Sequence, residues 1–413
     1  MNIMNEIRLL SVNNYHYVRG GAERIFIEQN RALRDAGYSV AEFCMSHPLN
    51  DNSHWESLFI SNLEYNESDL FLTKIDKATR VIWNRESRKN ISSLIRQFSP
   101  TVVHIHNVYH HISFSILPVL KRHRLPVIMT LHDLKLLCPA YSSFRNGAVC
   151  HKCSTGSYHN AIRYACVKNS RLGSLVAAAD NFLARKIGLV DRYVDVFVVP
   201  SKFYQNLFSR FGVPIHKLIY IPNFAADINN FPNAYLRDRF LYFGRLSYEK
   251  GVHVLLNAAH ISGVKLSLAG SGPEESSLKD FAAKLGVDCE FLGHLDGAQL
   301  TKVISNCRAV VVPSISYENA PLAVLEAMKC GRAVVASRIG GISELVEEGV
   351  TGFLFNPGDH QALAQHLRTL TSLTDDQWRA MEAASASSAS SYSLDSYLNR
   401  ITDLYKSFSD SKE

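Results

Sequence analysis

The sequence lacks any long hydrophobic run. No stretch approaches the roughly 18 apolar residues of a membrane-spanning helix, and no signal-peptide core precedes the strand-like run 7–12. Eight cysteines in 413 residues are too few for a disulfide scaffold. A net charge of +6 is too weak to indicate a nucleic-acid partner, although it suits anionic small molecules or an anionic membrane surface. We therefore expect a cytoplasmic protein that does not bind nucleic acid.

The composition is that of a globular protein, with 46% hydrophobic and 20% charged residues, and the length favours two domains. Short β-branched runs alternate with helical patterns, stop near residue 222 and start again near residue 240. Such alternation is typical of a doubly wound parallel α/β sheet. The expected organisation is an N-terminal domain (1–222), a linker (223–239), a C-terminal domain (240–390) and a final crossing helix (391–413).

The most informative stretch runs from Pro313 to Gly331. It follows a short apolar strand, and Pro321 suits the first turn of the helix that comes next. Glu318 lies in the loop and Glu326 lies inside the helix, eight residues later. A strand–loop–helix junction exposes N–H groups and a positive helix end, so acids there suit a ligand with both phosphate and sugar hydroxyls. The alternative is one loop acid and one solvated helix acid.

A second strand-to-helix turn, Gly244 to Gly251, carries Arg245 and Lys250. An arginine can bind two phosphate oxygens at once, whereas a lysine is a movable point charge. The turn Gly270-Ser271-Gly272-Pro273 lacks the third glycine of a dinucleotide fingerprint, but a flat base could lie against its backbone.

Two further features of the N-terminal half could face a ligand. Gly20 and Gly21 stand between a strand and a helix, where they allow close backbone approach to a phosphate or form a plain tight turn. His106 and His132 each follow a strand, at the edge where open α/β sheets bind ligands, although packed core histidines would give the same pattern.

Four cysteines gather in one insertion, 138–166: Cys138, Cys150, Cys153 and Cys166. A Cys-x2-Cys knuckle with one cysteine on either side resembles a four-thiolate structural zinc site, with His151 and His159 as substitute ligands. Free thiols are the alternative. Four thiolates would leave zinc no open position for chemistry.

The region 70–98 is predicted to form one long basic helix. Such a helix can lie on an anionic membrane, or it can pack on the core with a solvated polar face. The helical pattern at 394–408 predicts a helix that packs on other elements, whereas the Ala/Ser run 383–391 reads as a connection.

Together these motifs resemble a known family. Gly-Arg-Leu-x3-Lys-Gly, Ala-Gly-Ser-Gly-Pro and Glu-x7-Glu occur in the order typical of retaining GT-B glycosyltransferases of family four, also called glycosyl transferases group 1. Arg19-Gly20-Gly21 and Ile221-Pro222-Asn223 match as well, so the resemblance spans nearly the whole chain. It implies two Rossmann-like domains that face a cleft, with the last helix crossing back to the N-terminal domain.

The resemblance also implies an activity. The protein would move a hexose-type sugar from a nucleotide diphosphate sugar to a glycan or lipid-linked acceptor, with retention of configuration. Bacterial relatives commonly do so in surface polysaccharide synthesis, at times peripherally on the inner face of the membrane. No cofactor is required, and no general base is assigned, because a diphosphate oxygen can take the acceptor proton.

Roles carried over from the family apply position by position. Arg245 and Lys250 would hold the diphosphate, and Glu326 would bond the ribose. Glu318 would contact the transferred sugar and His132 one of its hydroxyls. Backbone and loop positions would complete the donor site: Gly20, Gly21, Gly272, Leu295, Asn319, Ala320, Pro321 and Leu322.

Two classes of alternative remain. A sugar-nucleotide epimerase or a phosphorylase could use the same architecture, although the acids and histidines of the first and the cofactor lysine of the second are not evident. A non-catalytic protein that binds sugar nucleotides or glycans would keep the fold but show no turnover.

Overall fold

The computed structural model describes residues 7–63, 71–225 and 238–409. The chain divides into two compact units. Unit 1 comprises Met1–Ser143, Cys150–Ile221 and Leu398–Glu413, and unit 2 comprises Phe144–Val149 and Pro222–Tyr397. Among the described helices, none combines the length and apolar character that crossing a bilayer requires.

Unit 1 contains a six-stranded parallel sheet with the order β2-β1-β3-β4-β7-β8. Its central strands are buried along almost their whole length, as expected when helices cover both faces. The strands are β1 (Arg8–Val12), β2 (Ser39–Phe43), β3 (Val102–Ile105), β4 (Val127–Thr130), β7 (Val196–Val199) and β8 (Leu218–Tyr220).

The helices of unit 1 follow the strands in alternation. They are α1 (Gly21–Asp35), α2 (Phe71–Ile82), α3 (Arg85–Phe98), α4 (Leu117–Arg122), α5 (His159–Arg163), α6 (Arg171–Asn181), α7 (Leu189–Tyr193), α8 (Lys202–Arg210) and α15 (Leu394–Ser409). A π-helical turn, Phe182–Lys186, continues α6.

Unit 2 contains a second six-stranded parallel sheet, with the order β11-β10-β9-β12-β13-β14. The strands are β9 (Arg239–Phe243), β10 (Lys265–Ala269), β11 (Cys289–Gly293), β12 (Val310–Val312), β13 (Val334–Ser337) and β14 (Gly352–Phe355). The helices are α9 (Val252–Ser262), α10 (Glu275–Leu285), α11 (Gly297–Asn306), α12 (Leu322–Lys329), α13 (His360–Ser372) and α14 (Asp375–Ala389).

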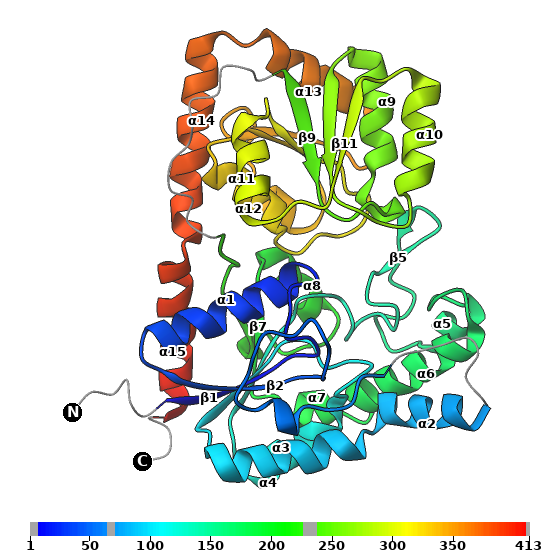
Figure 1. The fold of residues 1–413 in the computed structure, drawn as a ribbon. Helices are drawn as coiled ribbons and strands as arrows, with labels where there is room; N and C mark the ends of the chain where they lie inside the picture. Colours follow the sequence, from blue (N-terminus) through cyan, green and yellow to red (C-terminus); the bar gives the residue numbers. More distant parts are fainter. Residues whose placement is uncertain (1–6, 64–70, 226–237, 410–413) are drawn as a thin grey trace. The chain divides into compact units, whose positions relative to one another are not determined.

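Each face of the second sheet has its own core. Alternate residues of one strand point to opposite faces, so Phe240 and Tyr242 pack with α9, α10 and α13, while Leu241 and Phe243 pack with α11 and α12. Figure 1 shows β9 and β11 with α9 and α10 beside them. The predicted doubly wound α/β class is confirmed in both units.

The strand order locates one ligand crevice in each unit. In unit 1 the order reverses between β1 and β3, and in unit 2 it reverses between β9 and β12. Ligands of open α/β sheets bind beyond the carboxyl ends of the strands at such switch points. The segments that leave these four strands are therefore the first places to look for a site.

The last helix, α15, packs into unit 1 from Leu398 onward. The ring of Tyr405 is fully buried, and its hydroxyl lies 2.7 Å from His104 Nδ1 and 3.5 Å from Gln29 Nε2. The predicted packing of the 394–408 helix is therefore confirmed, and its anchor is a polar contact with a central strand of the first sheet.

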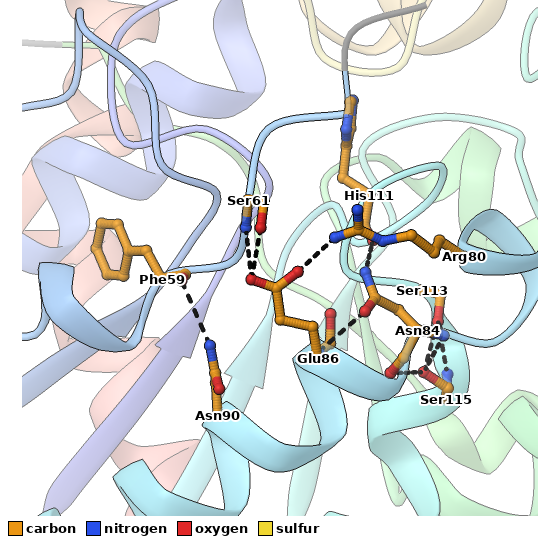
Figure 2. A network of polar contacts seen from close by, with 10 residues as sticks. Phe59, Ser61, Arg80, Asn84, Glu86, Asn90, His111, Ser113 and Ser115 are labelled. Atoms are coloured by element: carbon orange, nitrogen blue, oxygen red, sulfur yellow. Dashed lines mark hydrogen bonds and ion pairs between the residues drawn. The ribbon is translucent and has the colours of Figure 1, made fainter. Parts of the chain in front are cut away.

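The prediction of one long helix over 70–98 is wrong. The helix breaks at Trp83-Asn84, because Asn84 bonds to side chains and backbone far away in the sequence (Figure 2). Its backbone N–H donates to Ser113 Oγ at 3.3 Å and Ser115 Oγ at 3.1 Å, and its Nδ2 donates to the carbonyl of His111 at 2.8 Å. Its Oδ1 caps the new helix α3 by accepting from the Ser87 N–H at 3.0 Å.

The same network holds the start of α3 in place. Glu86 pairs with Arg80 of α2 and accepts from the Ser61 N–H at 2.9 Å and the Ser61 hydroxyl at 2.7 Å (Figure 2). The apolar face of α3 is buried, with Ile91 and Leu94 fully covered. Of the two readings of this region, core packing therefore applies to α3.

The Ala/Ser run predicted as a connection is also helical. Residues 383–389 complete α14, whose buried positions Trp378, Met381, Ser385 and Ala389 recur at helical spacing. Small side chains let α14 pack closely against α12. The Ser385 hydroxyl donates to the carbonyl of Thr351 at 3.2 Å. Strand β13 is followed by a short 3-10 turn, Gly340–Glu344.

The cysteine insertion has little regular structure. It contains the two-residue strands β5 (Phe144–Arg145) and β6 (Ala148–Val149), which pair antiparallel, and the short helix α5. Of the ten described non-glycine residues with positive φ, six lie between Tyr141 and Asn169. Such conformations are unfavourable for most residues, so this stretch depends on its tertiary contacts.

Candidate functional site

In unit 2, the turn after β9 packs directly against the turn after β10. The Gly244 N–H donates to the carbonyl of Ala269, and the Leu246 N–H donates to the carbonyl of Ser271, both at 2.9 Å. A Cβ on Gly272 would lie only 2.2 Å from the carbonyl oxygen of Leu246. The glycine at 272 is therefore required for this close approach, whether or not a base stacks on it.

This turn presents two cations in different states. Arg245 is exposed, and no hydrogen bond or ion pair of its guanidinium is found among the described residues. Lys250, at the end of a 3-10 turn, lies with Nζ 2.6 Å from Oε1 of Glu318. The carbonyl of Glu249 accepts from the Ile315 N–H at 2.9 Å, so this turn and the loop after β12 hold each other in place.

The carboxylate of Glu318 is anchored from two sides. Its Oε1 accepts from Lys250 Nζ and from the hydroxyl of Ser314, each at 2.6 Å. Its side chain keeps 12% exposure, so it remains within reach of a ligand.

The Glu318 backbone is clamped by the turn that follows β13. The carbonyl of Glu318 accepts from the Gly341 N–H at 2.8 Å, and Gly340 has a φ of +61°. A Cβ at position 340 would lie 2.1 Å from that same carbonyl oxygen. Only glycine fits here, because the position combines a left-handed backbone with direct contact to another main chain.

Helix α12 begins at Leu322, so Pro321, expected in the first turn, is its N-cap. The loop residue Asn319 and the first helical residue, Leu322, are partly exposed. Ala320 is buried, and its carbonyl accepts from Asn223 Nδ2 at 3.2 Å. Glu326 lies in the second turn and is only 8% exposed. The predicted set around Glu318 and Glu326 therefore lies at the start of one helix, at the switch point of the sheet.

Leu295 follows β11 and is partly buried against the core formed with α11 and α12. The end of β11 lies next to the turn after β10, because the Gly270 N–H donates to the carbonyl of Gly293 at 2.6 Å. The two positions assigned to the base, Gly272 and Leu295, thus follow neighbouring strands.

In unit 1, Gly20 is the N-cap of α1 and Gly21 is its first residue. Both are exposed, so the free N–H groups of a 15-residue helix are accessible at the switch point. Glu23 lies in the first turn, and burial raises the pKa of its carboxyl. This exposed helix end is consistent with the predicted phosphate or sugar contact.

The histidines at the ends of β3 and β4 form one buried array. His106 Nδ1 lies 2.9 Å from His132 Nε2 with the rings stacked, and His104 Nε2 lies 2.7 Å from the Thr130 hydroxyl. Burial lowers the pKa of His132 to about 4 and that of His104 to about 3. These rings are therefore neutral near pH 7 and suited to bond hydroxyls rather than to carry charge.

Behind His132 lies a buried polar network that the sequence did not reveal. Asp133 Oδ1 accepts from the Lys135 N–H at 2.8 Å, and burial raises the pKa of Asp133 to about 6. The Nζ of Lys135 lies 3.0 Å from Oδ2 of Asp180, with both side chains almost fully buried. The network fixes the segment after β4 onto α6 and so fixes the position of His132.

No three His, Cys, Asp or Glu side chains in the described ranges are arranged to ligate a metal ion. The four insertion cysteines are nevertheless neighbours. Burial, chiefly, and then the charges of Cys138, Cys166 and Cys150 raise the pKa of Cys153 to about 12. The zinc site stays a prediction.

The residues missed by sequence reasoning are those that support the motif from elsewhere in the chain. Ser314 and the pair Gly340-Gly341 position Glu318, while Asp133 and Lys135 support His132. The only sequence signal for Gly340-Gly341 is the paired glycine itself. Nothing in the sequence alone linked it to a loop about twenty residues earlier.

Comparison with known proteins identifies the family of the chain. The family model described as Glycosyltransferase Family 4 matches residues 19–226, half of the chain, and the model described as Glycosyl transferases group 1 matches residues 229–386. A glycogen synthase of Mycobacterium tuberculosis is 33% identical over 222 residues, which are 49% of this chain and 52% of the relative.

Two further relatives extend the comparison. The O-antigen chain mannosyltransferase C of Escherichia coli is 28% identical over 42% of this chain and 47% of its own. The alignments thus span about half the length of these curated relatives. The crystal structure of Anabaena HepE in complex with UDP has a TM-score of 0.68 at 20% identity, over 97% of this chain and all of HepE, which supports the GT-B fold. The chain therefore belongs to Glycosyltransferase Family 4, and its residues 229–386 match the glycosyl transferases group 1 model.

Proposed function

We propose that the protein is a glycosyltransferase that moves a hexose-type sugar from a nucleotide diphosphate sugar to a glycan or lipid-linked acceptor. One observation carries this proposal. Arg245, Lys250, Glu318 and Glu326 lie on segments that meet at the switch point of one sheet, where two cations and helix N–H groups suit a diphosphate and carboxylates suit sugar hydroxyls.

The chemistry follows from where charge develops. As the sugar–phosphate bond breaks, negative charge grows on the departing diphosphate. Arg245 and Lys250 are positioned to stabilise that charge, with N–H groups at the start of α12. Glu318, held by Ser314 and Lys250, is positioned to bond the transferred sugar, and Glu326 to bond the ribose.

We further propose that configuration is retained. In such a reaction the acceptor attacks on the face that the diphosphate leaves, and a diphosphate oxygen accepts the acceptor proton. No protein base is then needed, which fits the neutral His132. His132 would bond a hydroxyl of the donor sugar. HepE, whose structure was solved with UDP, and the O-antigen mannosyltransferase support a nucleotide-sugar donor and a role in surface polysaccharide synthesis.

The test is a binding screen followed by an assay for transfer. Purified protein is titrated with UDP, GDP, ADP, TDP and their sugars, and bound ligand is detected as a rise in melting temperature. Arg245→Ala should abolish the shift, whereas Arg379→Ala, an exposed arginine on α14 in the same unit, should leave it unchanged. No shift with any nucleotide would refute the donor-site assignment.

The alternatives give different products. A glycosyltransferase releases nucleotide much faster when an acceptor is present, and the anomeric signal of its product in NMR spectra reports retention. An epimerase changes the sugar while it is still attached to the nucleotide and needs no acceptor. A non-catalytic binding protein would show the Arg245-dependent shift without turnover.

A further inference from the structure

Four large apolar side chains on one short stretch of unit 1 are exposed. Leu172, Leu175, Phe182 and Ile187 keep 62%, 50%, 52% and 56% of their surfaces accessible. The first two lie on α6, Phe182 begins its π-helical continuation, and Ile187 is the C-cap of that turn. Residues three and seven apart share a helix face, so Leu172, Leu175 and Phe182 form one apolar stripe. Figure 1 shows α6 beside α5 and α2, all in unit 1.

The pattern of this helix is the reverse of the usual one. Its buried residues are small or polar, namely Ser174, Ala177, Ala178, Asp180 and Asn181, whereas its large apolar residues face outward. In most surface helices the large apolar side chains form the buried face.

The helix cannot rotate to bury the stripe without breaking its inner contacts. Asp180 pairs with buried Lys135 at 3.0 Å, and Asn181 Nδ2 donates to the carbonyl of Lys135 at 2.6 Å. Ala178 also packs against Cys153 and Tyr158 of the insertion. A rotation would leave a buried cation and a buried acid without their partners, which is strongly unfavourable. The stripe is therefore fixed on the outside.

The surroundings of the stripe are basic. Between residues 151 and 190 the sequence has six Lys or Arg and a single acid, Asp180, which is buried in its ion pair. Five of these cations are exposed: Lys152, Arg163, Lys168, Arg171 and Lys186. The neighbouring helix α2 adds Lys77 and one exposed acid, Asp76. The surface thus combines apolar side chains with a strong excess of positive charge.

We propose that this surface, formed by α6 and its continuation to Ile187, binds an anionic lipid bilayer. Leucine and phenylalanine would enter the acyl boundary while lysine and arginine meet the headgroups, the combination typical of interfacial helices. A symmetric contact between two copies of the chain is disfavoured, because it would bring like-charged rims together. The inference rests on the proposed function in one respect only: membrane binding would bring the protein close to a lipid-linked acceptor.

The test uses the full chain and no nucleotide sugar, so its outcome is independent of catalysis. Protein is sedimented with vesicles of phosphatidylglycerol and phosphatidylcholine, or of phosphatidylcholine alone, at low and high salt. Binding should require the anionic lipid and weaken at high salt. The double variant Leu175→Ser/Phe182→Ser should lose at least tenfold in partition coefficient. A matched control, Leu49→Ser/Ile215→Ser, changes two exposed apolar residues elsewhere in unit 1 and should bind like the parent.

A second readout guards against altered folding. In Phe182→Trp, the fluorescence of the added tryptophan should be quenched by brominated lipid in anionic vesicles. All variants should have the same melting temperature as the parent. The inference is refuted if the parent does not bind anionic vesicles or binds phosphatidylcholine alone equally well. It is also refuted if the stripe variant binds anionic vesicles like the parent. The same holds if vesicle binding is lost in Arg85→Glu/Lys89→Glu on α3 and not in the stripe variant. A dimer that only the stripe variant dissociates would identify a self-association surface instead.

Discussion

The Nζ atom of Lys250 lies 2.6 Å from Oε1 of Glu318, and the hydroxyl of Ser314 donates to the same oxygen at 2.6 Å. The cation proposed for the diphosphate and the acid proposed for the sugar are thus ion-pair partners. A diphosphate that draws Lys250 toward itself must compete with this ion pair. The two groups are therefore coupled, and changing one should alter the binding of the other's ligand.

Glu318→Gln tests that coupling. The amide keeps the shape but removes the charge that holds Lys250, so free nucleoside diphosphate should bind at least as tightly as to the parent. Sugar transfer should fall by about 10²–10³-fold in kcat, the range for one lost transition-state contact. Titration calorimetry and turnover separate the two effects. Glu275→Gln, on an exposed ion pair of α10, is the control. Weaker nucleotide binding together with normal transfer would contradict the assignment.

Gly340→Ala should damage the site from outside the motif. The added methyl would strike the carbonyl of Glu318 and would also force alanine into a left-handed backbone. Gly349→Ala provides a matched control, because Gly349 has a φ of +75° but open space around its Cβ position. Both variants should lose some stability, typically about 1 kcal/mol for an incompatible backbone. Only Gly340→Ala should also lose nucleotide-sugar turnover, and equal activity in the two would refute the clamp.

Acid should destabilise the protein through its buried histidines. Burial lowers the pKa of His104 to about 3, so the unfolded chain binds the proton more readily below its ordinary pKa of about 6.5. The contribution of His104 to the free energy of unfolding is fully present above about pH 6.5. It is lost as the pH falls from about 6.5 toward 3, by at most about 1.4 kcal/mol per pH unit. Asp133 acts in the opposite sense, because its pKa is raised to about 6.

Urea unfolding at several pH values between 7.5 and 5 measures this slope. His104→Asn should flatten the fall in unfolding free energy relative to the parent, and comparison of the two cancels the part due to Asp133. His216→Asn, an exposed histidine of unit 1, should leave the slope unchanged. A parent-like slope in His104→Asn would show that another group dominates.

Tyr405→Phe should weaken the attachment of α15 to unit 1. The change leaves the ring in place and removes the hydroxyl that lies 2.7 Å from His104 Nδ1. A buried partner left without its hydrogen bond costs about 1–3 kcal/mol. Hydrogen exchange should become faster in β3 and α15 and stay unchanged in β9 of unit 2. Faster exchange confined to unit 2 would contradict the contact.

The insertion cysteines are predicted to hold zinc. Protein purified without chelators should contain roughly one equivalent of zinc, because the four thiolates would together bind one tetrahedral zinc ion. Cys153→Ser should lose the metal and lower the melting temperature, whereas Cys289→Ser in unit 2 should keep both. Elemental analysis and thermal unfolding with and without chelator provide the measurements. The zinc site would be refuted if the parent protein contained no metal and melted at the same temperature with and without chelator.

The regular repeat of strand and helix was readable from the sequence because buried parallel strands are short runs of β-branched residues. The break at Asn84 was not readable, since its partners Ser113 and Ser115 lie about thirty residues away. Helix α14 was hidden by alanine and serine, although its buried positions had helical spacing. In the site, the motif residues were found from local patterns. The clamp by Gly340-Gly341 was not, because only the folded sheet brings it to Glu318.

The position of α15 has a consequence for how the chain is made. The helix that covers Gln29 and His104 follows the whole of unit 2 in the sequence. A ribosome therefore synthesises unit 2 before the first unit can be closed, although N-terminal domains usually fold first during translation. Until then, the residues that Tyr405 covers remain accessible to solvent and to chaperones. A separately expressed first unit should need residues 394–409 as a peptide before it reaches full stability.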